Sequence, residues 1–225
     1  MSEERVVKRR EGIENDGRDM MIVRCEEGCD EAVDMAAHDL IGGNLVVYPT
    51  ETVYGIGADA FNQVAVKNVY LAKNRPFDMA LSVAVADKRM MEQIAILDEN
   101  ADKLIKAFLP GPLTIIIQKR PEISDLVTAG SQKVGIRMPD NDIAMALVRK
   151  VGPIIATSAN IHSQPDATDV RTAFNCFGDK VSTYLDAGSS KLQKPSTIVW
   201  LMNGEFEIVR QGAIRGEDIE AALNA

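Results

Sequence analysis

The sequence predicts an α/β domain in which a mixed sheet is layered with helices. Runs typical of strands alternate with amphipathic stretches typical of helices, which is the pattern of a sheet covered by helices. At 44–58 and 197–210 two strand-like runs follow each other closely, so we expect antiparallel neighbours within the sheet. The 225 residues, 46% of them hydrophobic, are enough to bury a large core without disulfides.

The first 19 residues differ from the rest of the chain. They mix charged residues with glycine and show almost no apolar periodicity, so we expect 1–19 to be a flexible charged extension. We expect residues 20–225 to form a single domain. An apolar run at 21–25 predicts its first strand, and apolar residues at helical spacing up to Ile41 predict a helix that ends at Gly42.

The next segment carries the first group of polar residues. A β-rich run breaks at Pro49 and resumes as TVYGIGA, so two strands flank a bend that presents Thr50, Glu51 and Thr52. Asn62 is placed to cap the helix that follows, and Pro76 ends that helix.

The remaining elements follow from the same patterns of periodicity, caps and breaks. In chain order we expect a buried strand at 81–86, a helix from Asp98 to the PGP at 110–112, strands at 112–118 and 134–138, a helix capped by Asn141, a short apolar run at 153–160 that opens into a polar loop, a helix after Thr168, strands at 196–202 and 206–211, and a last helix around 219–223.

Charge and composition exclude several classes of protein. The chain has 25 Lys and Arg against 33 Asp and Glu, a formal net charge of -8, which disfavours general coating of nucleic acid but allows a local cationic cleft. No apolar run is long enough for a signal peptide or a membrane span. The spacing of the three cysteines, Cys25, Cys29 and Cys176, predicts reduced thiols in a cytoplasmic protein. The two histidines, His38 and His162, are too few for a histidine-built metal site.

Two motifs follow the ends of predicted elements. Lys73 and Arg75 stand at a helix end, where they could turn into one cleft or simply compensate the helix dipole. The TSAN sequence at 157–160 follows a strand and offers hydroxyl, amide and backbone N–H donors suited to phosphate, although it could equally be a turn with a cap.

Two arginines occupy the ends of apolar strands. Arg137 in GIRMPD and Arg210 in IVRQG are each followed by a break, which suits a guanidinium that binds carboxylate or phosphate. A structural salt bridge is the alternative, since the chain has an acidic surplus. The chain has no P-loop, GxGxxG, GxSxG or HExxH sequence.

Taken together, these motifs form an ordered set that covers about residues 21–215. The chain resembles the threonylcarbamoyl-adenylate synthase family, the YrdC-like domain, through PTETVYG, KNRP, PGPLT, GIRMPD, ATSAN, PSTIV and VRQG. The resemblance implies a twisted open mixed sheet around a deep basic cavity. It also implies a cytoplasmic nucleotidyltransferase that converts L-threonine, bicarbonate or CO2, and ATP to threonylcarbamoyl-AMP and pyrophosphate.

The resemblance also implies site residues and partners. Lys73 and Arg75 would be catalytic, and the ATP-binding residues would be Lys73, Arg75, Asn160 and Arg210, with Lys133 and Thr168 as further candidates. The threonine-binding residues would be Thr52, Arg137, Ser158 and Ser196. Mg2+ would be held mainly by nucleotide and water. The product would serve N6-threonylcarbamoyladenosine formation at position 37 of tRNA, so tRNA would be met only through a downstream transferase complex.

The sequence departs from the family pattern after KNRP. The family usually has a polar residue, then Pro, then a strand that carries His, whereas this chain has Met79, Ala80 and Ala84. Two alternatives therefore stay open: an RNA-binding module for ribosome or tRNA maturation, and a sister enzyme that uses another amino compound. Salt-dependent tRNA binding without ATP turnover would favour the first, and ATP turnover without threonine the second.

Overall fold

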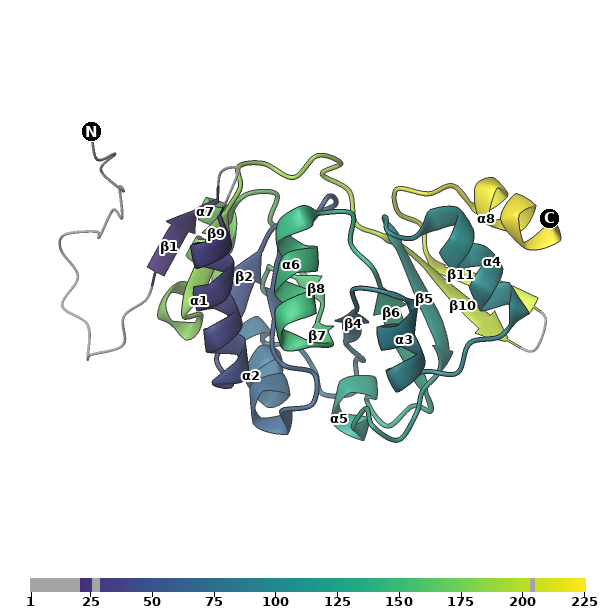
Figure 1. Ribbon diagram of the computed structural model, residues 1–225, viewed down its shortest axis with the longest axis horizontal. Coiled ribbons are helices and arrows are strands. Elements are labelled where there is room, and N and C mark those ends of the chain that lie inside the picture. Colours follow the sequence, from purple (N-terminus) through teal and green to yellow (C-terminus); the bar gives the residue numbers. More distant parts are fainter. Residues whose placement is uncertain (1–20, 26–28, 203–204) are drawn as a thin grey trace.

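The computed structural model describes residues 21–25, 29–202 and 205–225, and its strands form two mixed sheets with helices packed on them (Figure 1). The predicted extension at 1–19 lies outside the described residues. The prediction of an α/β domain with mixed strand directions is confirmed. The single predicted sheet is instead divided into two.

The first sheet has five strands in the order β1-β9-β2-β3-β8. Their bounds are β1 Met21–Arg24, β9 Thr183–Asp186, β2 Val46–Tyr48, β3 Gly55–Gly57 and β8 Thr157–Ser158. β9 pairs parallel with both β1 and β2, whereas β3 pairs antiparallel with β2 and β8. The β2–β3 pair is the hairpin expected around Pro49, so its bend projects residues 50–53 from one end of this sheet.

The second sheet has six strands in the order β11-β10-β5-β6-β4-β7. Their bounds are β11 Glu205–Arg210, β10 Thr197–Met202, β5 Leu113–Gln118, β6 Lys133–Arg137, β4 Ser82–Ala84 and β7 Ile154–Ile155. The pairs β10–β5 and β4–β6 are parallel, and the other three pairs are antiparallel.

The division into two sheets arises at Ala156. β7 pairs with β4 in the second sheet, and after one residue the chain continues as β8, which pairs with β3 in the first sheet. A single apolar run at 153–160 therefore crosses from one sheet to the other. Periodicity cannot distinguish this crossing from one continuous strand.

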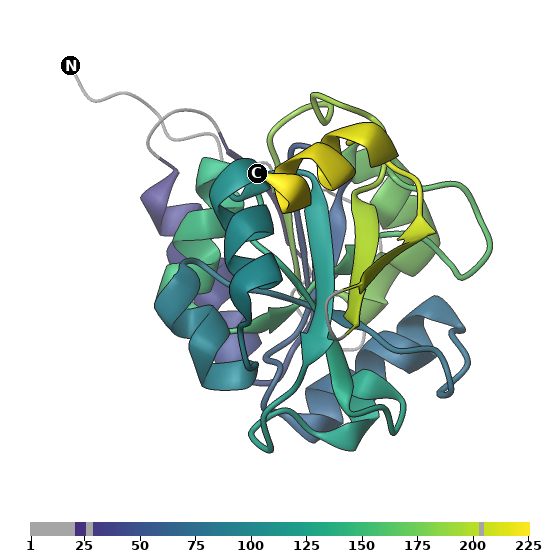
Figure 2. The ribbon, with the colours of Figure 1, turned by 90° about the vertical axis from the view of Figure 1, so that its right-hand side faces the viewer.

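Helices cover both sides of the sheets. Their bounds are α1 Asp30–Ile41, α2 Gln63–Lys73, α3 Lys88–Ile94, α4 Glu99–Phe108, α5 Asp125–Thr128, α6 Asp142–Val151, α7 Val170–Phe177 and α8 Gly216–Asn224. α1 packs beside α6, and α8 beside α4. Figure 2 shows α1, α4 and α6 on one side of the sheets and α2 on the other. No helix in the described part of the chain is long and apolar enough to cross a membrane.

The helix caps follow the sequence closely. The side chains of Asn62, Asp98 and Asn141 each accept a hydrogen bond from a backbone N–H in the first turn of their helices, as their positions predict. α2 ends at Lys73, before Pro76 requires it to end, because Asn74 adopts a left-handed conformation with φ 50°. This turn places Arg75 outside the helix while Lys73 remains in its last turn.

Candidate functional site

A cleft of about 170 Å³ lies between the two sheets, and five of the ten predicted site residues line it: Arg75, Arg137, Ser158, Ser196 and Arg210. It is lined by the β2–β3 bend, the end of β6, the crossing at 156–158 and the segments around 196 and 210. Its polar lining residues are Tyr48, Thr50, Tyr54, Arg75, Ser82, Thr114, Arg137, Thr157, Ser158, Ser196 and Arg210. The expected cationic cleft is thus present, with three arginines.

One row of neighbouring residues forms part of the cleft floor. Ile198 of β10 pairs with Thr114 of β5, Thr114 pairs with Arg137 of β6, and Arg137 pairs with Ala84 of β4. All four side chains line the cleft. The register of four strands therefore sets the position of Arg137.

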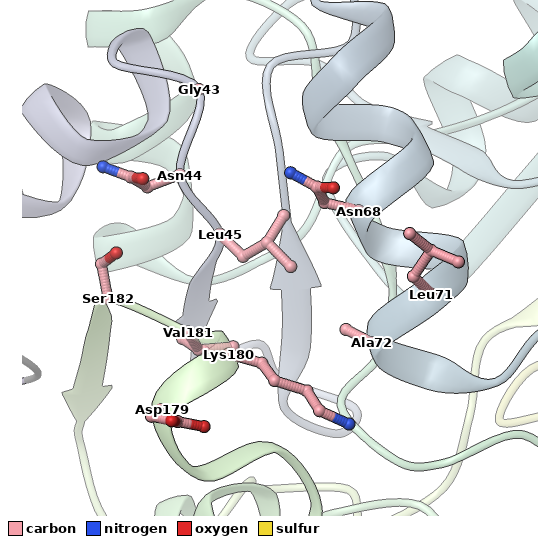
Figure 3. Close-up of a pocket in the computed structure, with 10 residues that line it drawn as sticks. All are labelled: Gly43, Asn44, Leu45, Asn68, Leu71, Ala72, Asp179, Lys180, Val181 and Ser182. Carbon is pink, nitrogen blue, oxygen red and sulfur yellow. The ribbon is translucent and has the colours of Figure 1, made fainter. Parts of the chain in front are cut away.

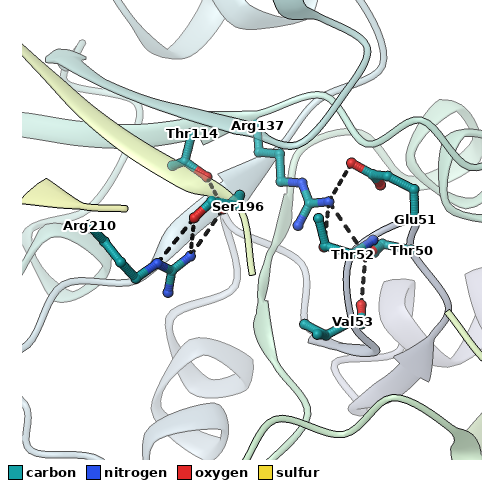
Figure 4. Close-up of polar contacts among 8 residues, drawn as sticks. All are labelled: Thr50, Glu51, Thr52, Val53, Thr114, Arg137, Ser196 and Arg210. Atoms are coloured by element: carbon teal, nitrogen blue, oxygen red, sulfur yellow. Dashed lines mark hydrogen bonds and ion pairs between the residues drawn. The ribbon is translucent and has the colours of Figure 1, made fainter. Parts of the chain in front are cut away.

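Arg137 is held from one side by the β2–β3 bend (Figure 4). Its Nη2 donates to Oε1 of Glu51 at 2.7 Å and to the Thr52 hydroxyl at 2.7 Å. Glu51 is 5% exposed and Thr52 is fully buried. One arm of the guanidinium fork, Nη2, is thus occupied by protein groups. The other arm, Nη1, makes no hydrogen bond to the described residues and is not fully buried.

Arg210 is bonded to Ser196 at another part of the cleft (Figure 4). Its Nε and Nη2 donate to the main-chain oxygen of Ser196 at 3.1 and 2.8 Å, and Nη2 also donates to the Ser196 hydroxyl at 3.1 Å. That hydroxyl lies 2.8 Å from the hydroxyl of Thr114. Burial lowers the pKa of Arg210, and the positive charges of Arg137 and Arg75 act in the same direction. The three cations therefore share one electrostatic environment.

Lys73 lies behind the cleft wall, since it is 2% exposed and does not line the cleft. Its Nζ donates to the main-chain oxygens of Ser158 and Asn160, the second at 2.7 Å, and to Oδ1 of Asn160 at 3.2 Å. Burial, together with the nearby charge of Arg75, lowers the pKa of Lys73 to about 8. The ammonium thus joins the end of α2 to the TSAN loop.

Arg75 reaches the cleft from the same helix end. Its Nε and Nη2 donate to the main-chain oxygens of Met79 at 3.1 Å and Ala80 at 2.8 Å. In the TSAN loop, the Ser158 hydroxyl donates to Oδ1 of Asn160 at 2.5 Å, and Ser158 lines the cleft whereas Asn160 does not. The KNRP and TSAN motifs are therefore one bonded unit.

Two predicted residues lie away from this group. Lys133 occupies the opposite end of β6 from Arg137, paired with Gln118, and is not in the cleft lining. Thr168 also lies outside the lining, and its main-chain oxygen accepts from the backbone N–H of Ser190 at 2.9 Å. The structure thus gives no contact between either side chain and the cleft.

Sequence reasoning missed several polar residues of the cleft. Thr114 and Ser82 stand within otherwise apolar strand runs, and Thr157 opens the TSAN motif without a role of its own. A polar residue within an otherwise apolar strand is the sequence signal that could have identified Thr114 and Ser82 as cleft residues.

A second hollow, of about 380 Å³, lies between the α1–β2 turn, α2 and the segment at 179–182 (Figure 3). Among the described residues, Lys180 is the one cation that lines this hollow, and none of the predicted site residues lies there. Although this hollow is larger, the convergence of arginines and hydroxyls identifies the smaller cleft as the candidate site.

The fold and the cleft define an α/β protein with a small cleft whose three arginines are suited to anionic groups. The sequence model of the Sua5/YciO/YrdC family, described as "Telomere recombination", matches residues 39–212. The chain belongs to this family.

Relatives of known sequence and structure agree with this assignment. A relative from Methanocaldococcus jannaschii is 38% identical over 84% of this chain and 89% of its own length. The threonylcarbamoyl-AMP synthase of Bacillus subtilis is 39% identical over 86% of this chain but only 57% of its own length. The crystal structure of Pyrococcus abyssi Sua5 complexed with L-threonine superposes with a TM-score of 0.86 at 34% identity, covering 90% of this chain and 60% of that one.

Proposed function

We propose that the protein is an L-threonylcarbamoyladenylate synthase. It converts L-threonine, bicarbonate or CO2, and ATP to threonylcarbamoyl-AMP and pyrophosphate. The observation that carries this proposal is the convergence of Arg75, Arg137 and Arg210 on one cleft, in a family whose member of the same fold was crystallised with L-threonine.

The reaction has two bond-forming steps. The threonine nitrogen forms a bond to the carbon of CO2 and loses a proton, which gives a carbamate. A carbamate oxygen then forms a bond to the α-phosphorus of ATP while the bond from that phosphorus to the bridging oxygen breaks, and pyrophosphate leaves. These steps gather anions and need positioning and charge neutralisation rather than a protein nucleophile.

The cleft offers partners for each anionic group. We assign the threonine carboxylate to the free Nη1 of Arg137, with Ser158 and Ser196 on the same amino-acid side. Thr52 contributes by holding Arg137, because its side chain is buried against the guanidinium.

The phosphates are assigned to Arg75 and Arg210, which are the remaining cations of the cleft. Lys73 and Asn160 act through the TSAN loop, since the present bonds of Lys73 are all to that loop. Lys133 and Thr168 receive no role in this arrangement.

Mg2+ enters the proposal with the nucleotide. The described residues contain no group of three or more His, Cys, Asp or Glu side chains that could hold a metal ion, and the lining of the cleft supplies arginines and hydroxyls. This donor set fits Mg2+ that is carried by phosphate oxygens and water and not by a protein cage. When bound, the ion would neutralise part of the phosphate charge.

We further propose that the product is consumed by a threonylcarbamoyl transferase complex that modifies adenosine 37 of tRNA in the cytoplasm. The net charge of -8 supports contact with tRNA through that complex and not through this chain.

Incorporation of labelled carbon tests the proposed function. The protein is incubated with ATP, L-threonine and 13C-bicarbonate, and the nucleotides are analysed by mass spectrometry. We expect an AMP adduct that contains one threonine and one labelled carbon. Salt-dependent tRNA binding without any such adduct would instead indicate an RNA-binding module.

A further inference from the structure

The cleft is rich in cationic donors but has no anionic acceptor in its described lining. Its described lining includes three arginines and no carboxylate. Arginine cannot accept a hydrogen bond, so the guanidinium groups can bind the anionic parts of the substrates but not an amino group. The Glu51 carboxylate pairs with Arg137 and does not line the cleft. An amino acid bound here therefore needs a different acceptor for its N–H groups.

Most hydroxyls of the cleft are held in place by hydrogen bonds to protein groups, which fixes their orientation. Each of the following is hydrogen-bonded to another protein group: Tyr48, Thr50, Tyr54, Thr114, Ser158 and Ser196. Ser82 and Thr157 also line the cleft. Their hydroxyls make no hydrogen bond to the described residues, and neither hydroxyl is fully buried.

Ser82 is the one polar residue of the apolar run at 81–86. It lies on the same face of β4 as Ala84, because the two are two positions apart on the strand and both line the cleft. Its partner on β6 is Gly135, where an added Cβ would lie 3.0 Å from the Ser82 hydroxyl oxygen. The absence of a side chain at Gly135 thus leaves room for this hydroxyl on the cleft floor.

Ser82 is close both to Arg137, which is assigned to the substrate carboxylate, and to the TSAN loop. Gly135 is two residues from Arg137 on β6, a separation of about 7 Å along the strand. The backbone N–H of Ala156 donates to the main-chain oxygen of Ser82 at 2.8 Å, so Thr157 follows directly beside β4. Two free hydroxyls therefore flank the region where an amino acid held by Arg137 would carry its α-amino group.

We propose that Ser82, assisted by Thr157, accepts a hydrogen bond from the α-amino group of the amino-acid substrate. This inference rests on the proposed function and names the group that recognises the nitrogen. The amine must lose a proton before it can attack carbon. A carboxylate partner would stabilise the ammonium form and raise its pKa, whereas a hydroxyl carries no charge and leaves the neutral amine accessible.

Binding calorimetry of Ser82→Ala tests the proposal, with L-threonine and its analogue without the amino group, 3-hydroxybutanoate, as ligands. We expect the Kd for L-threonine to rise about three- to tenfold, the effect of one lost hydrogen bond, while the Kd values for ATP and 3-hydroxybutanoate stay unchanged. Thr157→Val should act in the same direction. Ser182→Ala, which removes a hydroxyl outside the cleft, is the matched control and should bind L-threonine like the wild type.

Two results would overturn the proposal while leaving the proposed function intact. One is an unchanged Kd for L-threonine in Ser82→Ala. The other is an equal loss for L-threonine and 3-hydroxybutanoate, which would place the contact on the carboxylate or hydroxyl of the ligand. Pyrophosphate release by the wild type that depends on L-threonine establishes the proposed function separately. A wild type that binds no L-threonine would overturn both.

Discussion

The ammonium nitrogen of Lys73 lies 2.7 Å from the main-chain oxygen of Asn160, so the last turn of α2 is bonded to the TSAN loop. The same nitrogen also donates to the main-chain oxygen of Ser158. Arg75 leaves the helix two residues later and reaches the cleft that Ser158 also lines. Two motifs that are far apart in the sequence thereby act as one structural unit, with Lys73 at its centre.

Lys73→Met should disrupt this unit. The variant keeps an apolar stem of similar length but leaves buried acceptors without a donor, at a cost of about 1–3 kcal/mol. For a chain of this size we expect the melting temperature to fall by roughly 2–10 °C, together with a loss of ATP turnover. Calorimetry and turnover measured on the same sample check this. Full turnover at an unchanged melting temperature would contradict the role of Lys73.

ATP binding should weaken at alkaline pH because of Lys73. Burial lowers the pKa of Lys73 to about 8, so the ammonium loses its proton and its charge as the pH rises through that value. The neutral amine has two N–H donors for three acceptors, which loosens the TSAN loop. Titration of ATP in the absence of amino acid, between pH 6.5 and 9.5, should show the affinity declining above about pH 8. A decline of the same size in Lys73→Met would assign the effect to another group.

Arg75→Ala should lose activity without losing the fold. Arg75 is partly exposed, and its hydrogen bonds go to two main-chain oxygens of its own loop. Removing a cation that contacts the transferring phosphates is expected to cost about 2–4 kcal/mol of transition-state stabilisation, or roughly two to three decades in kcat/KM. Steady-state kinetics and circular dichroism test the two halves of this prediction. Wild-type kcat/KM in the variant would remove Arg75 from the phosphate site.

Ala84→His should improve threonine binding. Ala84 lines the cleft and pairs with Arg137 across β4 and β6, so an imidazole at this position would enter the amino-acid side of the site. One added hydrogen bond corresponds to about 0.5–1.5 kcal/mol, and the KM for L-threonine should fall by up to about tenfold while the KM for ATP changes little. An unchanged or higher KM for L-threonine would show that another group already occupies this place.

Local features of the fold could be predicted because they depend on neighbouring residues. The caps at Asn62, Asp98 and Asn141 and the bend after Pro49 are set by residues within one turn of each other. The division of the sheet at Ala156 could not be predicted, since it depends on β4 and β3 as pairing partners from distant parts of the chain. β9 could not be predicted because its four residues, TYLD, show no clear alternation of apolar and polar side chains.

The candidate site shows the same limit. Arg137 and Arg210 stand at strand ends, and strand ends that meet at one edge bring their side chains together. Lys133 lies on the same strand as Arg137, but its place at the far end of β6 takes it away from the cleft. The burial of Lys73 is invisible in the sequence, because its three acceptors are supplied by a loop more than 80 residues away.

Release of pyrophosphate from ATP and bicarbonate, measured with L-threonine, with L-serine and without an amino acid, tests the central claim most directly. A site built for threonine should gain about 1–3 kcal/mol from the methyl group that serine lacks. We predict release that requires both bicarbonate and L-threonine and is at least several-fold slower with L-serine. Release that continues at the same rate without L-threonine, or that does not distinguish the two amino acids, would contradict the account.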